Sequence, residues 1–253
     1  MTPWILLRGL MRDARHWGDF AERFGAAVGA PTITLDLPGN GSRYHDTSPA
    51  SVPAMADWCR AELRRQGIAP PYRLFAMSLG AMVAVAWAAQ APYELDAVVL
   101  VNTSLKPFSP FWRRLQPRAW PTVLRNALTA PDAETQERAV LRLTSRHHAH
   151  NAALLAQWTS WHRAQPVSRA NGLRQLWAAA QYHAPHQAPQ TRLLVLTSQG
   201  DALVDHRCSL ALAHAWNTAL AIHPSAGHDL PLDDSAWVAA RVAEWLQPVS
   251  LES

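Results

Sequence analysis

The sequence predicts an α/β fold in which a mostly parallel sheet of about six strands is flanked by helices and interrupted by a helical insertion. Three observations support this prediction. The chain has 253 residues, which is close to the largest size that one hydrophobic core supports. Short apolar runs alternate with longer helical stretches toward both ends of the chain, as is typical of a sheet covered on both faces. The middle of the chain contains no convincing strand pattern.

The expected strands are short and apolar, and a loop with Gly, Pro, Ser or Asn usually follows each. They are Trp4–Leu7, Thr32–Leu35, Arg73–Ala76, Ala97–Val101, Arg192–Thr197 and Leu220–His223. The expected helices begin at a helix-start signal or carry an apolar stripe at helical spacing. They are Pro53–Gln66, Leu79–Gln90, Asp205–Trp216 and Ser235–Leu246.

Residues 106–190 are predicted to form the helical insertion, which leaves residues 1–105 and 191–253 as the core domain. The composition of this segment shifts to Arg, His, Trp, Gln and Ala, and its leucines and tryptophans are spaced as in amphipathic helices. Between Lys106 and Arg192, twelve basic and three acidic residues give a net charge of +9, whereas the rest of the chain carries −5. The basic charge is therefore concentrated in the insertion.

Composition excludes several classes of protein. With 49% hydrophobic residues, 17% charged residues and a mean hydropathy of −0.14, the chain is not a disordered protein, a collagen-like repeat or a polytopic membrane protein. The longest apolar run, Ala81–Ala89, is far shorter than the roughly 20 residues of a membrane span. The N-terminal residues resemble no signal peptide, and two cysteines are too few for a disulfide scaffold. We therefore expect a cytoplasmic protein.

Ser78 lies where a strand is expected to end and an alanine-rich helix to begin, within Ala76-Met77-Ser78-Leu79-Gly80. A nucleophile on such a turn has a strained backbone that exposes its hydroxyl group above the sheet. The helix N-terminus adds free N–H groups that suit a developing oxyanion. Ala76 replaces the glycine of the usual pattern, and the alternative role of Ser78 is an ordinary helix N-cap.

Asp201 and His228 lie in loops expected to follow the last two strands. Ligand sites of open α/β sheets lie at the carboxyl ends of the strands. A nucleophilic serine requires a base, and that base requires an orienting acid. The chain order Ser78, Asp201, His228, with each residue after its own strand, therefore predicts a Ser-His-Asp triad.

Three other residues compete for these roles. Asp205 is an alternative acid, but it is expected at the start of a helix, where a carboxylate commonly acts as a cap. His223 competes with His228, but it falls at a strand end before Pro224 and is expected to be structural. Asp36 is expected to fix the glycine-rich loop that follows it through backbone hydrogen bonds.

These motifs resemble those of the α/β-hydrolase superfamily, and the chain is similar to compact capped esterases such as the pimeloyl-ACP methyl ester esterase branch. The residues that carry the resemblance are Leu7-Arg8-Gly9-Leu10, Leu35-Asp36-Leu37-Pro38-Gly39-Asn40-Gly41, Ala76-Met77-Ser78-Leu79-Gly80, Gly200-Asp201-Ala202-Leu203-Val204 and Gly227-His228. The resemblance implies that Ser78 is the nucleophile, His228 the base and then the acid, and Asp201 the orienting residue. It also implies an oxyanion hole made by the backbone N–H groups of Leu10 and Leu79. In this family the acid can instead follow the preceding strand, where the chain has Asn102.

Arg8 occupies the position where the family usually has a histidine. Its guanidinium group could bind a substrate carboxylate or phosphate, or it could brace the loop through hydrogen bonds to carbonyl groups. Met77, Trp112 and Trp158 are further candidates for substrate binding. The tryptophans of the insertion, which the resemblance identifies as a cap, would form an apolar acyl-binding wall or would only pack against the core.

The expected activity is hydrolysis of a carboxylic ester or thioester through an acyl-enzyme intermediate. The same triad would also serve an acyltransferase, a thioesterase or a C–C bond hydrolase, and a non-catalytic binding protein with this fold is the alternative of another class.

The expected ligand is a small-molecule ester or acyl compound. The basic insertion is a solvated surface or a docking face for an acidic acyl-carrier protein, whereas the sequence has no nucleic-acid-binding module. No metal or cofactor is expected, because His147, His148 and His150 spread around a helix without a supporting acid or thiol cluster. The Gly39-Asn40-Gly41 loop also lacks the lysine of a phosphate-binding loop.

Overall fold

Six parallel strands form a sheet in the order β2-β1-β3-β4-β5-β6. The computed structural model describes residues 1–129 and 132–247. The strands are β1 (Trp4–Leu7), β2 (Thr32–Leu35), β3 (Tyr72–Met77), β4 (Leu95–Val101), β5 (Arg192–Ser198) and β6 (Ala219–His223). The prediction of a parallel sheet of about six strands flanked by helices is confirmed.

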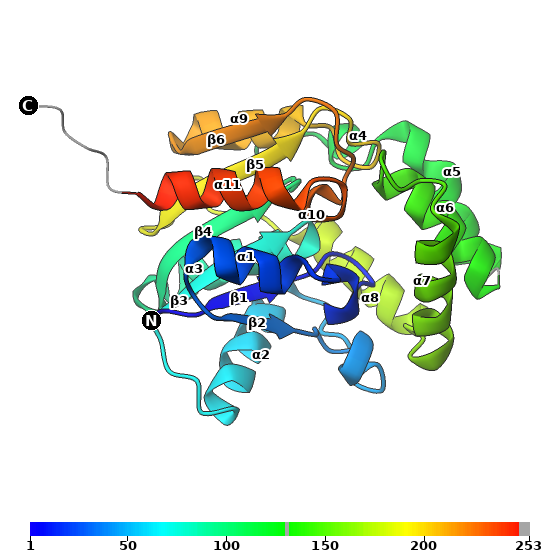
Figure 1. The fold of residues 1–253 in the computed structure, drawn as a ribbon, viewed down its shortest axis with the longest axis horizontal. Coiled ribbons are helices and arrows are strands. Elements are labelled where there is room, and N and C mark those ends of the chain that lie inside the picture. Colours follow the sequence, from blue (N-terminus) through cyan, green and yellow to red (C-terminus); the bar gives the residue numbers. More distant parts are fainter. Residues whose placement is uncertain (130–131, 248–253) are drawn as a thin grey trace, which may run out of the picture.

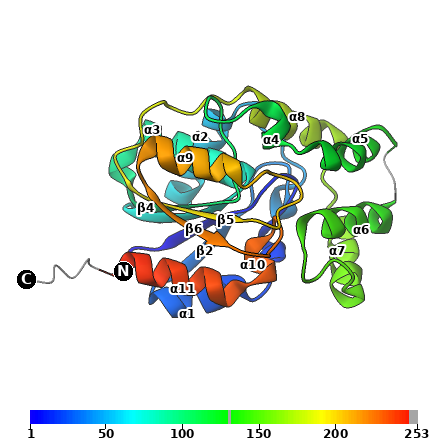
Figure 2. The same ribbon diagram turned by 90° about the horizontal axis from the view of Figure 1, so that it is seen from above.

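Helices cover both faces of the sheet (Figure 2). The longer ones are α1 (Phe20–Val28), α2 (Val52–Arg65), α3 (Leu79–Gln90), α9 (Arg207–Trp216) and α11 (Ser235–Leu246), and α10 (Leu230–Asp233) is a single turn. One apolar cluster joins the sheet to α2, α3 and α9, and a second joins the other face to α1 and α11. Side chains along β3 alternate between them: Leu74 and Ala76 enter the first cluster, and Phe75 and Met77 enter the second.

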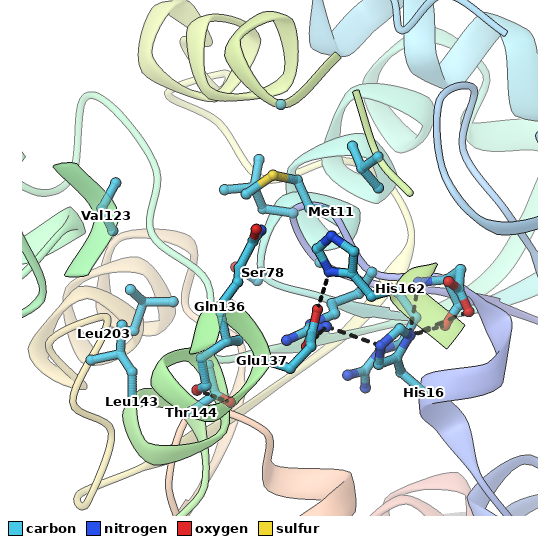
Figure 3. Close-up of a pocket in the computed structure, with 18 of the residues that line it drawn as sticks. Met11, His16, Ser78, Val123, Gln136, Glu137, Leu143, Thr144, His162 and Leu203 are labelled. Atoms are coloured by element: carbon cyan, nitrogen blue, oxygen red, sulfur yellow. Dashed lines mark hydrogen bonds and ion pairs between the residues drawn. The ribbon is translucent and has the colours of Figure 1, made fainter. Parts of the chain in front are cut away.

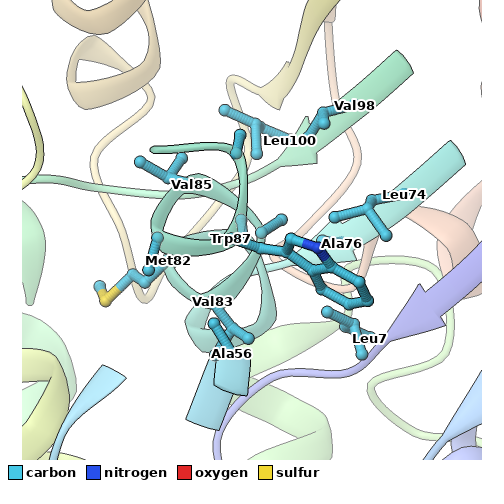
Figure 4. Close-up of a cluster of buried hydrophobic side chains, with 14 of the residues drawn as sticks. Leu7, Ala56, Leu74, Ala76, Met82, Val83, Val85, Trp87, Val98 and Leu100 are labelled. Atoms are coloured by element: carbon cyan, nitrogen blue, oxygen red, sulfur yellow. The ribbon is translucent and has the colours of Figure 1, made fainter. Parts of the chain in front are cut away.

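Helix α3 lies at the centre of the first cluster (Figure 4). Its side chains from Leu79 to Ala88 are all buried, as expected of a helix that is apolar on every side. The Trp87 ring packs against Tyr72 with ring centroids 5.6 Å apart, and its Nε1 donates a hydrogen bond to Glu94 Oε2 at 2.9 Å. The helix that begins beside Ser78 is thus held rigidly against the sheet.

The chain between β4 and β5 forms a helical segment, which we call the inserted segment (residues 106–190). Its helices are α4 (Phe111–Arg114), α5 (Trp120–Thr129), α6 (Ala133–Thr144), α7 (Ala152–Ala164) and α8 (Arg169–Gln181). The strand-like pairing among its described residues is an isolated bridge between Lys106 and His183. Figure 1 shows α5, α6 and α7 beyond the ends of the strands, away from the layers of the core.

The expected and observed elements differ at a few ends. Helix α1 was not predicted, and α9 begins at Arg207, two residues after the predicted start at Asp205, whose Oδ1 accepts the Arg207 N–H at 3.0 Å. Helix α2 begins at Val52, one residue before Pro53, with the Ser51 hydroxyl accepting the Ala54 N–H at 3.4 Å. Across the described ranges 1–129 and 132–247, no helix combines the length and apolarity that crossing a bilayer requires.

Candidate active site

Ser78 connects β3 to α3 in a strained backbone conformation, with φ 54° and ψ −115°. Positive φ values are unfavourable for a residue with a Cβ atom, so neighbouring groups must hold this turn in place. The Ser78 N–H donates to Val101 O at 2.9 Å, and the Thr103 hydroxyl donates to Ser78 O at 3.3 Å. Residues at and just beyond the end of β4 therefore hold both the N–H group and the carbonyl group of Ser78.

Two glycines let the turn approach the loop after β1. A Cβ atom on Gly80 would lie 2.6 Å from both Leu7 O and Arg8 O, and one on Gly9 would lie 3.1 Å from Ser78 Cβ. Only glycine fits at Gly80, because the atoms it would strike belong to the backbone. Ala76, the departure from the usual motif, is fully buried in the first apolar cluster, which accommodates its methyl group.

The structure brings Asp201 and His228 into direct contact. Asp201 Oδ2 lies 2.7 Å from His228 Nδ1, and both side chains are buried. Asp201 Oδ1 accepts the N–H groups of Leu203 at 2.7 Å and Val204 at 2.9 Å, which orients the carboxylate. Because the carboxylate accepts from Nδ1, Nε2 of the neutral imidazole is left as the proton acceptor.

The inserted segment supports the loop that carries Asp201. Gln116 Nε2 and Arg118 Nη2 donate to Asp201 O at 2.9 and 2.6 Å, and Arg118 Nε donates to Ala202 O at 3.2 Å. The backbone of the loop that carries Asp201 is therefore held by side chains of the inserted segment.

Asn102 directly follows β4, where the acid of the family can also lie, and its side chain here makes structural hydrogen bonds. Like Ser78, it has a positive φ, 44°. Its Nδ2 donates to His228 O at 2.8 Å and to Gly227 O at 3.2 Å, while its Oδ1 accepts the Ser198 N–H at 2.9 Å. The side chain thus ties β4 to β5 and to the loop that carries the imidazole.

The competing residues have other partners. Asp205 forms a salt bridge with Arg207, which holds the pKa of that carboxyl below its usual value. His223 Nδ1 accepts the Ala226 N–H at 2.9 Å. Asp36 accepts backbone N–H groups from two segments, including that of Ala14 at 2.7 Å. None of these three residues lines the cavity described next.

Ser78 and His228 line one cavity of about 320 Å³ between the core and the inserted segment. Leu10, Met77 and Arg8 line it as well, whereas Asp201 lies behind His228 and Leu79 is buried beneath the turn. Figure 3 shows Val123, Leu143 and Leu203 on one side of Ser78 and His16, Glu137 and His162 on the other. The polar side chain of Thr144 lies with Leu143, and Met11 and Gln136 also line the cavity.

Trp112 and Trp158 do not line this cavity, which corrects their predicted place. Trp112 is 52% exposed and packs edge-on against Phe111 with ring centroids 5.2 Å apart. Trp158 is buried, but its ring faces the loop after β1, where the Arg12 guanidinium lies 4.5 Å from the ring centroid. Helical spacing predicts an apolar face that includes Trp158, but it does not indicate which neighbour covers that face.

Arg8 is buried and paired with Asp229, the residue after His228. Its Nη2 and Nη1 lie 2.5 and 3.1 Å from the two carboxylate oxygens, and its guanidinium lies 4.6 Å from the centroid of the Trp17 ring. Burial raises the pKa of Asp229, but the Arg8 charge outweighs burial and the pKa is lowered. The pair is therefore ionic and self-neutralising. Arg8 braces its loop, as one interpretation expected, but through a carboxylate and not through carbonyl groups.

No local sequence pattern indicates the Arg8–Asp229 and Arg12–Glu137 pairs, whose members lie 221 and 125 residues apart. The one feature that could have drawn attention to Asp229 is its place directly after His228.

Within residues 1–129 and 132–247, no group of His, Cys, Asp or Glu side chains is arranged to hold a metal ion.

The family model for the alpha/beta hydrolase fold matches residues 5–235. Among solved structures, a thermophilic esterase from Thermogutta terrifontis is 21% identical with a TM-score of 0.77, covering 97% of this chain and 89% of that one. A lipase-esterase related protein from Clostridium acetobutylicum is 14% identical with a TM-score of 0.76, covering 97% and 94%. A hydrolase from Pseudomonas aeruginosa is 17% identical with a TM-score of 0.74, covering 98% and 90%.

No curated protein sequence matches the chain. The structural neighbours share its fold at low identity, and the family model spans nearly its whole length. The chain belongs to the α/β-hydrolase fold family.

Proposed function

We propose that this protein hydrolyses a carboxylic ester or thioester by covalent catalysis at Ser78. The observation that carries the proposal is the buried Asp201–His228 pair, 2.7 Å between Oδ2 and Nδ1. It lies beside a serine held at positive φ, and the serine and histidine line the same cavity. An activated serine needs this base and this orienting acid. Membership of the esterase branch that the motifs resemble is part of the same proposal.

The reaction would proceed in two halves. Ser78 Oγ attacks the carbonyl carbon while His228 Nε2 takes its proton, and His228 then gives that proton to the leaving alcohol or thiol. Water attacks the acyl-enzyme, with His228 taking a proton from the water and returning it to Ser78 Oγ as the carboxylic acid leaves. The N–H groups of Leu10 and Leu79 would receive the oxyanion, because Leu79 is the first residue of α3 and the loop containing Leu10 packs against the turn.

The inserted segment would act as a cap that selects the substrate. Helices α5, α6 and α8 each contribute side chains to the cavity, among them Val123, Leu143 and Leu176. The same triad would serve thioester cleavage, acyl transfer or C–C bond hydrolysis. Product analysis with water and with an added alcohol as acceptors separates hydrolysis from acyl transfer, and a panel of ester, thioester and C–C substrates separates the bonds cleaved.

An acidic acyl-carrier protein is a candidate carrier of the acyl group. The inserted segment has eleven basic and three acidic residues, and this net charge of +8 supports the idea, because opposite charges steer association. If a carrier docks there, kcat/KM for a carrier-bound thioester falls steeply with added salt, whereas kcat/KM for the free thioester does not. Equal salt dependence of the two substrates contradicts carrier docking.

The test of the proposed function pairs a fluorophosphonate probe with intact-mass measurement. We expect stoichiometric labelling of the wild type and of Ser42→Ala, an exposed serine outside the cavity, and no labelling of Ser78→Ala. Ester hydrolysis by Ser78→Ala should fall about a thousandfold or more. Equal labelling of all three proteins would show that another serine is the nucleophile. No labelling of any of them would favour a non-catalytic binding protein.

A further inference from the structure

The turn that carries the expected oxyanion donor Leu10 has an unfavourable backbone conformation. It runs from Gly9 to Arg12 and is closed by the Arg12 N–H, which donates to Gly9 O at 3.2 Å. Met11, the third residue of the turn, has a φ of 53°. Turns with a positive φ at this position ordinarily have Gly or Asn there, and a larger residue adopts it only where its surroundings hold it. A contact from outside the turn is therefore needed at Met11.

Helix α8 of the inserted segment supplies this contact through Gln175. The Met11 N–H donates to Gln175 Oε1 at 2.9 Å, and the Gln175 side chain is fully buried. This N–H belongs to the central peptide of the turn, between Leu10 and Met11, so the hydrogen bond fixes the plane of that peptide. Rotation of the central peptide would exchange the positive φ at Met11 for a negative one. Gln175 therefore holds the conformation that Met11 does not itself favour.

A buried hydrogen-bond network fixes the orientation of the Gln175 amide. Its Nε2 donates to Asn40 Oδ1 at 2.8 Å and to Ser48 Oγ at 3.0 Å. Asn40 Nδ2 in turn donates to Arg12 O at 3.0 Å, and the Ser48 hydroxyl donates its own hydrogen to a backbone carbonyl at 2.6 Å. Because both amide hydrogens of Gln175 have acceptors in this network, Oε1 is the atom that faces Met11. The network therefore holds the turn at two successive residues.

The same helix also packs on the Met11 side chain. A Cβ atom on Gly172, three residues before Gln175, would lie 2.8 Å from Met11 Sδ. Met11 and Gly172 both line the cavity that Ser78 lines, and Figure 3 shows Met11 and Ser78 among its residues. Helix α8 thus contacts both the backbone and the side chain of Met11 at the candidate active site.

We propose that Gln175 is a positioning residue for the oxyanion hole. Gln175 does not line the cavity, and it acts through the peptide that directly follows the Leu10 N–H. The inserted segment then does more than enclose a substrate, because one of its helices sets the geometry of an oxyanion donor. This inference rests on the proposed function, to which the oxyanion hole belongs.

Gln175→Met tests this role, because methionine has a similar length but no amide oxygen for the Met11 N–H. We expect kcat/KM for butyl hexanoate to fall about 30-fold, less than on removal of an oxyanion donor, because the Leu10 N–H is displaced and not deleted. The inhibition constant of pentyl trifluoromethyl ketone should rise by the same factor. Ser78 Oγ adds to the carbonyl carbon of this ketone while His228 takes the serine proton, and the carbonyl oxygen becomes an oxyanion in the same hole. Unchanged values of both constants would overturn the inference.

The matched control is Asn171→Leu on the same helix. Asn171 is buried, its Oδ1 accepts the Ser48 N–H at 2.9 Å, and its Nδ2 donates to Asp46 O at 2.9 Å. These bonds tie α8 to the segment that contains Ser48, as those of Gln175 do, but neither of them reaches the turn at Met11. We expect Asn171→Leu to lower the midpoint of chemical denaturation as Gln175→Met does, and to keep both constants close to those of the wild type. Equal changes of the constants in the two variants would show that the network is only structural.

Met11→Gly tests the route by which Gln175 acts. Glycine adopts a positive φ without steric cost, so the turn in this variant depends less on the contact from α8. Adding Gln175→Met to Met11→Gly should lower kcat/KM only about threefold, against about 30-fold in the wild-type background. An equal fall in the two backgrounds would overturn the inference.

Hydrogen exchange gives a readout that needs no substitution. The Met11 amide of the wild type should exchange slowly, because it donates to a buried acceptor. Fast exchange of this amide would overturn the inference even if Gln175→Met did not fold.

The fluorophosphonate probe separates this inference from the proposed function. If the wild type is not labelled at Ser78, the proposed function fails and the role of Gln175 in an oxyanion hole fails with it. If the wild type and Gln175→Met are labelled at the same rate, only the role of Gln175 fails, because phosphonylation also develops negative charge on an oxygen in the hole. We expect labelling of the wild type and of Asn171→Leu at similar rates, and slower labelling of Gln175→Met.

Discussion

Two buried ion pairs leave the same loop after β1 and connect it to different regions of the molecule. Arg8 pairs with Asp229 within the core, with a shortest N···O distance of 2.5 Å, and Arg12 pairs with Glu137 of the inserted segment at 2.6 Å. Each guanidinium lies over a tryptophan ring, at 4.6 and 4.5 Å from the ring centroid. The local chemistry of the two pairs is therefore nearly the same.

Their consequences differ because their partners differ. Asp229 adjoins His228, so the Arg8 pair joins the loop of the expected oxyanion hole to the loop that carries the imidazole. Glu137 lies on α6, so the Arg12 pair joins the core to the inserted segment and forms one wall of the cavity. Under the proposed function, the first pair would position reacting groups, and the second would shape the cavity through which a substrate reaches them. Four experiments test this difference between the two pairs.

The largest effect is expected from Arg8→Met. It leaves Asp229 charged and buried without its partner, so the free energy of unfolding should fall by about 3–5 kcal/mol in chemical denaturation. Adding Asp229→Leu should restore most of that stability, because the unpaired charge is gone. If Arg8 is a positioning residue, the double variant remains slow in kcat with an altered pH profile. Full recovery of kcat would show a purely structural role.

Arg12→Met should destabilise the protein less than Arg8→Met, by about 1–3 kcal/mol. The Arg12 side chain is 12% exposed against 3% for Arg8, and Glu137 retains a hydrogen-bond partner in His162. The same denaturation experiment measures the difference. We also expect KM to change more than kcat, since the lost group lies on a cavity wall. An equal or larger loss of stability would contradict the contrast.

Acid should weaken the second pair within a defined range of pH. The pKa of Glu137 is lowered from 4.5 to about 2 in the folded protein. Its ionised form therefore contributes stability above pH 4.5, and this contribution is lost as the pH falls toward 2. The free energy of unfolding, measured through this range, should fall less steeply for Glu137→Gln than for the wild type. Identical slopes would show that Glu137 titrates normally.

The smallest effect is expected from Arg23→Ala. Arg23 and Asp19 form an ion pair of 2.6 Å on α1 whose side chains are 67% and 63% exposed. Exposed pairs of this kind contribute about 0.5 kcal/mol or less. Thermal and chemical denaturation should therefore scarcely distinguish this variant from the wild type. A loss comparable to that of Arg12→Met would mean that burial does not explain the difference between these pairs.

The sequence predicted the core better than the inserted segment for a physical reason. Strands such as β1 and β2, and helix α3, match their predicted bounds because buried elements read as continuous apolar runs bounded by turn residues. The inserted segment is helical as expected, but periodicity does not specify which neighbour covers an apolar face. The sequence could therefore not predict that the Trp158 ring faces the loop after β1, or that Trp112 is 52% exposed.

In the candidate site, too, local features could be predicted from the sequence, whereas contacts between distant segments could not. Ser78, Asp201 and His228 could be predicted because each follows a strand at the same edge of the sheet. The partner of Arg8 could not, since ion pairs between distant segments leave no local pattern. The sequence indicates only that Asn102 is not an acid, and it reveals neither its positive φ nor its hydrogen bond to the His228 loop.

The hydrogen bonds from Gln116 and Arg118 to Asp201 O have a consequence for engineering. Transplanting residues 106–190 from a homologue is one way to exchange specificity in such a fold, but that transplant would also remove two donors to the loop that carries Asp201. A chimera whose junction follows Ala119 would keep both donors and replace only α5 to α8. The useful boundary for recombination therefore lies inside the inserted segment and not at the end of β4.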